Sequence, residues 1–360
     1  MDPCQFAYRA RRNVDDALLF VLNKIYAHLD KPRSYIRIMF FDFSSAFNTI
    51  QTHLLARKLE LMNMNSPTVL WILDYLNNRP QQVKLNEKVK SEVRYTNTGA
   101  PQGTVLSPFL FSLYTADIRS QHINTTITKF ADDTALIGLI TDSDEAMYKH
   151  EIQNFVSWCD DNFLQLNVKK TKEMVIDFRQ KKPNTDSVEI KGEKVEKVKT
   201  YKYLGVVFDD KLSWREHADT TARKIHSRMY CLRKLRSFNV SQKILQMFYT
   251  AVIGSVLTFG MSCWGGNLSK QDKGRLDKLI RKAGGVIGRK QDDLGTLHDR
   301  VVIRKYHKIM SDNTHPLREE FESRKTERSN RFRLPATRTT RYKQSFIPTA
   351  IRMHNSNTQR

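Results

Sequence analysis

The chain has 360 residues, and its 60 lysines and arginines exceed its 38 aspartates and glutamates, which gives a formal net charge of +22. Such an excess indicates a polyanionic partner, most simply nucleic acid, with salt-sensitive binding. The hydrophobic content of 40% is more than an extended basic tail needs and excludes a chain that is mainly such a tail.

The cysteines and the first residues bear on the cellular compartment. Cys4, Cys159, Cys231 and Cys263 are far apart and form no Cys-x-x-Cys pair. This spacing argues against a zinc module and for reduced thiols in the cytosol or nucleus. Charged residues come before any apolar run, so we expect no secretory signal. We therefore expect a protein of the nucleus, the cytoplasm or both, and not a secreted one.

The first part of the chain alternates helical and strand patterns. Apolar residues at helical spacing after Asn13 predict a helix over 14–29, and β-favouring residues predict a buried strand over 35–43. A loop at 98–104 has glycines on each side of Pro101. These glycines indicate either that a ligand approaches the backbone closely or only that the chain makes a tight turn. Further helices are predicted at 54–62, 69–76, 105–118 and 145–162, and further strands at 82–85, 92–96, 174–178, 188–190 and 200–208.

From Trp214 onward the pattern is helical. Residues 218–235 carry an apolar stripe with basic residues on the other faces, which suits a phosphate backbone, although any soluble helix can share it. Further helices are predicted at 242–252, 273–283 and 297–310.

One segment, residues 244–264, contains no charged side chain and is long enough to span a bilayer. Its polar residues, its two glycines and the basic residues on both flanks favour one or two buried helices instead. We expect no stable membrane association.

The tail beyond Glu327 is basic and contains no acidic residue. Phe332, Tyr342 and Phe346 are interleaved with its arginines and lysines, a mixture that suits phosphate contact and base stacking. A disordered basic tail is the alternative.

Two adjacent aspartates, Asp132 and Asp133, stand between β-favouring residues, which predicts a hairpin with both carboxylates near its tip. The simplest alternative is a solvated turn. Like charges that lie together need a neutralising cation, and Mg²⁺ prefers one or two carboxylates completed by water and substrate phosphate. If the strand ending at Asp42 lies beside this hairpin, the three carboxylates can hold two metal ions for an in-line displacement at phosphorus. Together with the positive charge, this predicts phosphoryl or nucleotidyl transfer on nucleic acid.

Five short motifs follow one another along the chain. They are Phe-Asp-Phe-Ser-Ser-Ala-Phe-Asn at 41–48, Gly-Ala-Pro-Gln-Gly at 99–103 with Leu-Ser-Pro at 106–108, Phe-Ala-Asp-Asp at 130–133, Leu-Asn at 166–167 with Lys-Thr at 170–171, and Tyr-Leu-Gly at 203–205. In this order they resemble the palm motifs of reverse transcriptases, in particular those of non-long-terminal-repeat, LINE-type retrotransposons. Residues 341–348 also resemble the C-terminal end of the polyproteins of such elements.

This resemblance implies an α+β fold. It would be a right-hand polymerase palm, an antiparallel sheet with packed helices, followed by a mainly helical thumb and a C-terminal region. The implied domains are a remnant of the fingers region at 1–34, the palm at 35–212, the helical thumb at 213–290 and a basic C-terminal region at 291–360. The chain would then be N-terminally truncated relative to the family.

The resemblance also implies a role for each motif residue. Asp42, Asp132 and Asp133 would be catalytic and would hold two Mg²⁺ ions, or Mn²⁺, with the carbonyl of Phe43 as a further ligand. Around the nucleotide, Phe47 would exclude a 2′-hydroxyl, Gln102 would contact nucleotide and template, and Lys170 would lie near the triphosphate as a proton donor. The primer end would be positioned by Tyr203, Leu204 and Gly205.

The implied activity is that of an RNA-directed DNA polymerase, which adds deoxynucleotides to a primer 3′-hydroxyl. Its partners would be an RNA template, a DNA primer and deoxynucleoside triphosphates. The alternative is a catalytically silent nucleic-acid-binding remnant. Family members have further basic residues in the fingers region that grip the triphosphate, and an N-terminally truncated chain would lack them.

Overall fold

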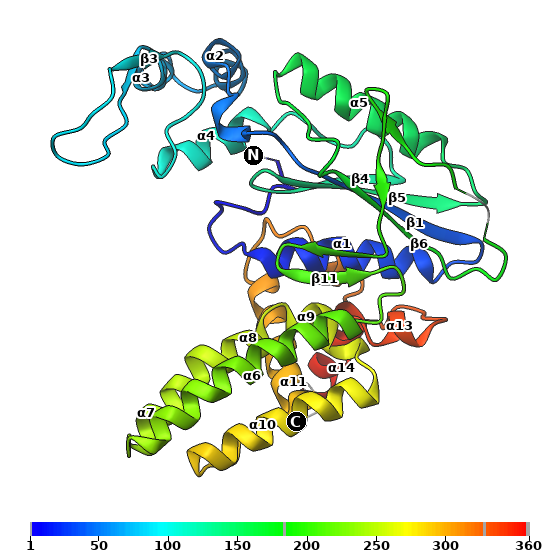
Figure 1. Cartoon of the computed structure of the whole chain (residues 1–360). Coiled ribbons are helices and arrows are strands. Elements are labelled where there is room, and N and C mark those ends of the chain that lie inside the picture. Colours follow the sequence, from blue (N-terminus) through cyan, green and yellow to red (C-terminus); the bar gives the residue numbers. More distant parts are fainter. Residues whose placement is uncertain (1, 183–184, 327–328, 358–360) are drawn as a thin grey trace.

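The computed structural model describes residues 2–182, 185–326 and 329–357, and its centre is a five-stranded sheet (Figure 1). The strand order is β4-β5-β1-β6-β9, in which β6 and β9 pair in parallel and the other neighbours are antiparallel. All eight residues of β1 are buried, as expected for a central strand covered on both faces. The bounds are β1 Ser34–Phe41, β4 Thr125–Phe130, β5 Asp133–Thr141, β6 Lys172–Ile176 and β9 Glu196–Lys197.

The lower face of the sheet in Figure 1 is covered by α1, Val14–Leu29. Asn13 caps this helix as predicted, in a capping box with Asp16. Alternate residues of β1, namely Ile36, Ile38 and Phe40, share a hydrophobic core with this helix.

The upper face of the sheet is covered by four helices (Figure 1). Their apolar residues form a second hydrophobic core with the other alternate apolar residues of β1. These helices confirm the predicted ones, except that the helix expected over 105–118 runs only from Leu106 to Tyr114. Their bounds are α2 Thr52–Leu61, α3 Ser66–Leu76, α4 Leu106–Tyr114 and α5 Ala146–Asp161.

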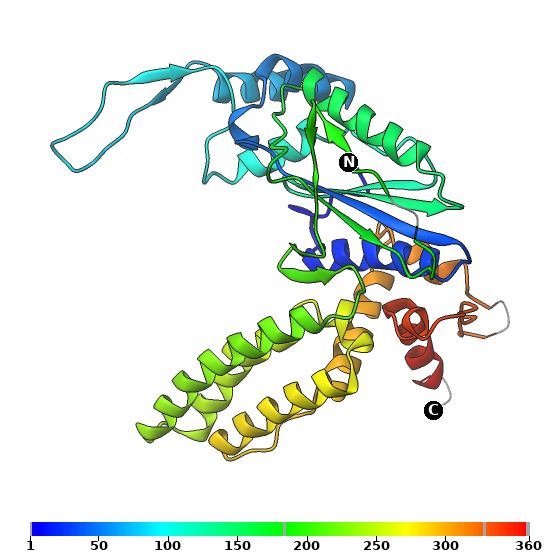
Figure 2. The same cartoon turned by 45° about the vertical axis from the view of Figure 1, so that its right-hand side comes forward.

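Three short hairpins complete the first part of the chain. The predicted strand at 82–85 was wrong, because the strand pairing falls at β2, Arg79–Gln81, with β3, Arg94–Thr96, and Val83 and Leu85 beyond it are exposed. Figure 2 shows the loop between these strands projecting away from the body. A second small hairpin joins β7, Glu189–Ile190, to β8, Glu193–Lys194.

The single strand predicted at 200–208 was also wrong, because this segment folds back on itself. It forms an antiparallel hairpin of β10, Thr200–Tyr203, and β11, Val206–Asp209. Both residues of the intervening turn have positive φ, 47° at Leu204 and 84° at Gly205. A glycine in such a turn reverses a β-favouring run that would otherwise continue.

A helical layer follows, and its core is continuous with the lower face of the sheet. The predicted apolar stripe on α6 is confirmed, since Ala218, Ala222, Ile225, Met229 and Leu232 are buried. The elements are α6 Arg215–Ser237, α7 Gln242–Phe248, a π-helical segment Tyr249–Gly254, α8 Ser255–Thr258, α9 Met261–Trp264, α10 Lys270–Ile287 and α11 Leu294–Met310.

Within the described ranges, no single helix has both the length and the apolar character to cross a membrane. The segments Gln242–Thr258 and Met261–Asn267 meet those criteria only when taken together, and they are bent by 41° at the break between them.

The last part of the chain folds against α1 and α11. Its helices are α12 Arg318–Glu322, α13 Thr340–Lys343 and α14 Phe346–Asn357. The base-stacking role predicted for Phe332, Tyr342 and Phe346 was wrong, because all three side chains are buried in the core. The disordered tail is likewise contradicted over residues 329–357, while 327–328 and 358–360 lie outside the described residues.

Candidate catalytic and metal site

The sheet register brings the three aspartates to one end of the central strands. Phe41 of β1 pairs with Thr134 of β5, so Asp42 and Asp133, which follow and precede them, stand opposite each other where this antiparallel pairing ends. Asp132 lies in the two-residue turn between β4 and β5, next to Asp133. The predicted hairpin and its position beside the strand that ends at Asp42 are therefore confirmed.

The carboxylates influence one another electrostatically. Burial raises the pKa of Asp133, and the negative charges of Asp132 and Asp42 raise it further. The Oδ2 atom of Asp42 is buried and accepts no hydrogen bond from the described residues. The ammonium of Lys170 is the cation that the described residues bring to this oxygen, with its Nζ at 4.0 Å.

These features fit a hard divalent cation. Among the described residues, no group of three or more His, Cys, Asp and Glu side chains encloses a common point as a complete cage would. Mg²⁺ does not need such a cage, because it takes one or two carboxylates and completes its shell with water and phosphate oxygens. The crowded carboxylates and the orphaned oxygen of Asp42 supply that incomplete donor set.

The turn that carries Asp132 is held from the N-terminal segment. Ala131 has a φ of 57°, and its backbone N–H donates to Oε1 of Gln5 at 3.2 Å while Nε2 of Gln5 donates to the Ala131 carbonyl at 3.4 Å. Two backbone hydrogen bonds, from Phe6 to Lys129 and from Lys129 to Cys4, align this segment beside β4. Sequence reasoning missed Gln5, although a buried glutamine within an apolar and aromatic segment is a signal of a polar contact.

Asp42 is held by the Leu-Asn and Lys-Thr motif. Its carbonyl accepts from the backbone N–H of Asn167 at 2.8 Å, and its own N–H donates to Oγ1 of Thr171 at 3.3 Å. This places Lys170 beside the carboxylate, with 71% of its side chain exposed. Phe43 forms a β-bridge with Leu166, and its half-buried ring packs near Phe155.

The glycine-flanked loop packs against the residues after Asp42. The N–H of Ala100 donates to the Phe47 carbonyl at 2.8 Å, and the Phe47 ring lies 5.0 Å from that of Phe111 on α4. Gly99 has a φ of +71°, and a Cβ there would lie 2.7 Å from the Asn48 Cα, so close packing alone requires this glycine. Gly103 also has a positive φ but faces open space.

The exposed side chain of Gln102 extends from the same loop, with its Nε2 3.5 Å from Oδ1 of Asn48. The loop and the residues after Asp42 thus form one wall beside the aspartates.

The β10–β11 hairpin lies near the aspartates on the opposite side of β1. Tyr201 stacks on Phe40 of β1 with ring centroids 4.2 Å apart. Tyr203 is buried, and burial together with the charge of Asp133 raises the pKa of its hydroxyl. Leu204 and Gly205 are half-exposed at the turn, so of the three predicted primer-positioning residues these two are the more accessible.

A model of the reverse transcriptase (RNA-dependent DNA polymerase) family matches residues 1–208. The chain belongs to this family. A second model, described as the N-terminal part of alkylated DNA repair protein alkB homolog 8, matches residues 214–255.

Curated relatives of this chain come from LINE-type elements, which confirms the predicted non-long-terminal-repeat type. The chain is 25% identical over 290 residues to the probable RNA-directed DNA polymerase from transposon BS of Drosophila melanogaster, covering 78% of this chain and 32% of the relative. It is 24% identical over 276 residues to the polymerase from mobile element jockey of Drosophila funebris, covering 72% and 29%. The chain thus spans about a third of the length of these relatives.

Solved structures with some similarity include apo telomerase from Candida tropicalis, at a TM-score of 0.41 and 10% identity over 83% of this chain and 54% of that one. Telomerase from Candida albicans in complex with a fragment of telomeric RNA gives a TM-score of 0.37 and 13% identity over 84% and 54%.

Proposed function

We propose that this chain is the polymerase core of a LINE-type reverse transcriptase, which adds deoxynucleotides to a primer 3′-hydroxyl on an RNA template. The observation that carries the proposal is the meeting of Asp42 with Asp132 and Asp133 at one end of the sheet, within a chain of this family. The partners are an RNA template, a DNA primer and deoxynucleoside triphosphates, and the place of action is the nucleus, the cytoplasm or both.

The metal-holding groups in this proposal are the carboxylates of Asp42, Asp132 and Asp133 and the carbonyl of Phe43. When bound, two Mg²⁺ or Mn²⁺ ions would supply activation of the primer hydroxyl and stabilisation of the leaving pyrophosphate. Lys170 donates a proton toward the departing pyrophosphate from its exposed ammonium, which already lies beside Asp42.

The remaining motif residues orient the substrates. The half-buried ring of Phe47 lies under the sugar and excludes a 2′-hydroxyl, and Gln102 contacts nucleotide and template. Tyr203, Leu204 and Gly205 position the primer end, with Tyr203 acting through its backbone because its side chain is buried.

The proposal includes four regions: the end of the fingers at 1–34, the palm at 35–212, the thumb at 213–290 and a basic C-terminal region at 291–360. Exposed basic residues on α6 hold the RNA–DNA duplex through its phosphates, including Arg223, Lys224, Arg233 and Lys234.

Primer extension on an RNA template with Mg²⁺ tests the proposal. The wild-type chain should extend the primer, Asp132→Asn should not, and Asp74→Asn, a matched change at an exposed site on α3, should extend it normally. Phe47→Ala should incorporate ribonucleotides more readily than the wild type. If the wild type and Asp132→Asn both bind the duplex and neither extends the primer, the enzymatic role is refuted for this chain.

A further inference from the structure

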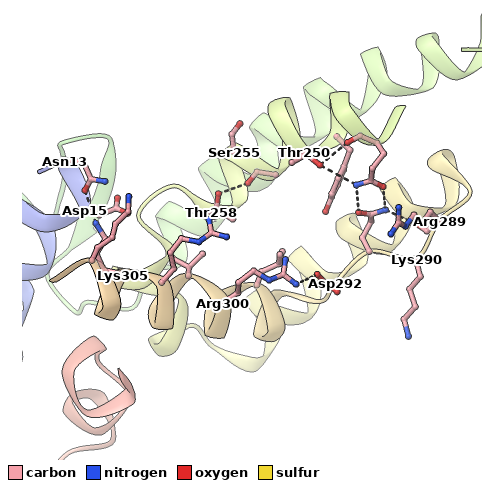
Figure 3. A pocket seen from close by; sticks show the side chains of 18 residues that line it. Asn13, Asp15, Thr250, Ser255, Thr258, Arg289, Lys290, Asp292, Arg300 and Lys305 are labelled. Carbon is pink, nitrogen blue, oxygen red and sulfur yellow. Dashed lines mark hydrogen bonds and ion pairs between the residues drawn. The ribbon is translucent and has the colours of Figure 1, made fainter. Parts of the chain in front are cut away.

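A groove of about 680 Å³ lies in the helical layer, and none of the aspartates, loops or hairpins of the catalytic site lines it. Figure 3 shows its two walls, one formed by α7, the π-helical segment and α8, and the other by α11. The link between α10 and α11, with Arg289 and Lys290, closes one end. A volume of this size suits a ligand of a few nucleotides and not a duplex.

The groove is strongly cationic, with six basic and two acidic side chains along it. Arg300 pairs with Asp292 at 2.5 Å, and Lys305 pairs with Asp16 at 3.0 Å. The other four basic side chains form no ion pair within the described part of the chain, and they are Arg289, Lys290, Arg304 and Lys308. Asp15 at the α1 end of the groove offsets part of the charge of Lys305 and Lys308, and the remaining excess of positive charge attracts a polyanion.

Three of the cations follow one face of α11. Arg300, Arg304 and Lys308 are spaced four residues apart, so successive side chains rise by about 6 Å along the helix. All three are exposed, and they also line a second hollow of about 540 Å³ with His307 and Ser311. The result is a ridge of regularly spaced cations with a hollow on each side, which matches a chain of regularly spaced phosphates.

The facing wall is polar but uncharged. It includes Tyr249, Thr250 and Gly254 from the π-helical segment, a rare conformation that often occurs at functional sites. The hydroxyl of Thr250 donates to the carbonyl of Gln246 at 3.0 Å, so its hydrogen is already used within its own wall. A single strand of nucleic acid in the groove would therefore contact cations on one side through its phosphates and neutral groups on the other.

We propose that this groove binds the phosphodiester backbone of a single-stranded stretch of nucleic acid, at a site separate from the catalytic one. The recognised chemistry is a row of phosphates, held by Arg304 and Lys308 of α11 with help from Arg289 and Lys290. Guanidinium and ammonium groups bind such phosphates without regard to base sequence.

Fluorescence anisotropy with a labelled single-stranded RNA, in the presence of a chelator, tests the site without any polymerase activity. Arg304→Ala with Lys308→Ala should weaken binding several-fold and reduce the slope of log K against log salt by about 1.4, because each lost phosphate contact on a single strand contributes about 0.7. Lys278→Ala with Lys282→Ala on α10 is the matched control, since it removes two exposed lysines at the same four-residue spacing outside the groove. An equal loss in both double variants overturns the proposal in favour of unspecific attraction.

Thr250→Glu provides a second variant that keeps every cation and places a carboxylate on the facing wall. It should also weaken RNA binding, with an unchanged unfolding midpoint because Thr250 is exposed. Photo-crosslinking with a thiouridine-labelled RNA should mark peptides from 249–258 and 297–311. Crosslinks confined to residues 2–212 overturn the proposal.

Two further measurements distinguish RNA from a small phosphate compound as the ligand, and a failed groove proposal from a failed polymerase proposal. Inorganic tripolyphosphate should compete only weakly, and competition as strong as that of unlabelled RNA assigns the groove to a small phosphate compound instead. Asp132→Asn should bind the single-stranded RNA as the wild type does, so a failure of primer extension leaves the groove test intact.

Discussion

Replacing Gln5 by alanine should loosen the turn that carries Asp132 and Asp133. The Gln5 side chain makes one hydrogen bond to each backbone group of Ala131, and its Oε1 also accepts from the N–H of Ala7 at 3.0 Å. Gln5 and Ala131 are both buried, so truncation leaves backbone donors without a partner. Such loss costs about 1 to 3 kcal/mol per group, and the long bonds to Ala131 place the expected cost at about 2 kcal/mol.

The loss should be local and measurable by hydrogen exchange followed by mass spectrometry. About 2 kcal/mol corresponds to roughly thirty-fold faster exchange through local opening in peptides spanning 127–137. Peptides from α10 should exchange as in the wild type. Gln271→Ala, at an exposed position on α10, is the matched control and should leave both regions unchanged.

The Gln5→Ala variant should also bind Mn²⁺ more weakly at the aspartates. Electron paramagnetic resonance can measure this binding without catalysis. Unchanged exchange in the hairpin with unchanged Mn²⁺ affinity would refute the view that Gln5 positions this turn.

Three further predictions concern stability and are checked by urea unfolding. Gly99→Ala should lower the free energy of unfolding by about 2 kcal/mol more than Gly103→Ala, because both have positive φ but only at Gly99 would a Cβ meet backbone atoms; equal losses would contradict this. Arg37→Met should cost about 3 to 5 kcal/mol, because it leaves the carboxylate of Glu173 buried without its cation, and adding Glu173→Met should recover much of that loss. No recovery in the double variant would argue against the pair. Burial lowers the pKa of His217 from 6.5 to about 4, so its imidazole binds a proton at higher pH in the unfolded chain than in the folded one. The free energy of unfolding should therefore fall by about 3 kcal/mol in total as the pH drops from about 6.5 to 4. His217→Gln should lose that part of the pH dependence, and identical pH profiles for the two proteins would refute this assignment.

The local patterns in the sequence were sufficient for most helices and for the acidic hairpin. The Asn13 cap, the apolar stripe of α6 and the paired aspartates at a turn all depend on residues close together in the chain. The order of the five motifs likewise identified the family that the comparison confirmed. Such features are fixed by side-chain periodicity and turn chemistry, which need no knowledge of distant neighbours.

The predictions from the sequence were wrong where the conformation or the burial of a segment depends on residues that are distant in the chain. The run at 200–208 is β-favouring on both sides of Gly205, and its turn at Leu204 and Gly205 together with its packing on Phe40 makes it a hairpin. The alternating residues Val83 and Leu85 are exposed, because the strands next to them, β2 and β3, form only a two-stranded sheet. The aromatic residues of the C-terminal segment were expected to face nucleic acid, yet they complete a core begun by α1 and α11.

The sequence by itself determined the family, through its five ordered motifs, and predicted that Asp42, Asp132 and Asp133 would lie together. Only the tertiary structure shows that Gln5 hydrogen-bonds to the turn that carries Asp132, 126 residues away. The same holds for Arg37 and Glu173, which lie 136 residues apart and form a buried ion pair within the sheet. The cationic groove of α11 also exists only because α7, α8 and α11 face one another. Buried polar partners and grooves depend on how separate elements pack, and side-chain periodicity along one segment carries no record of that packing.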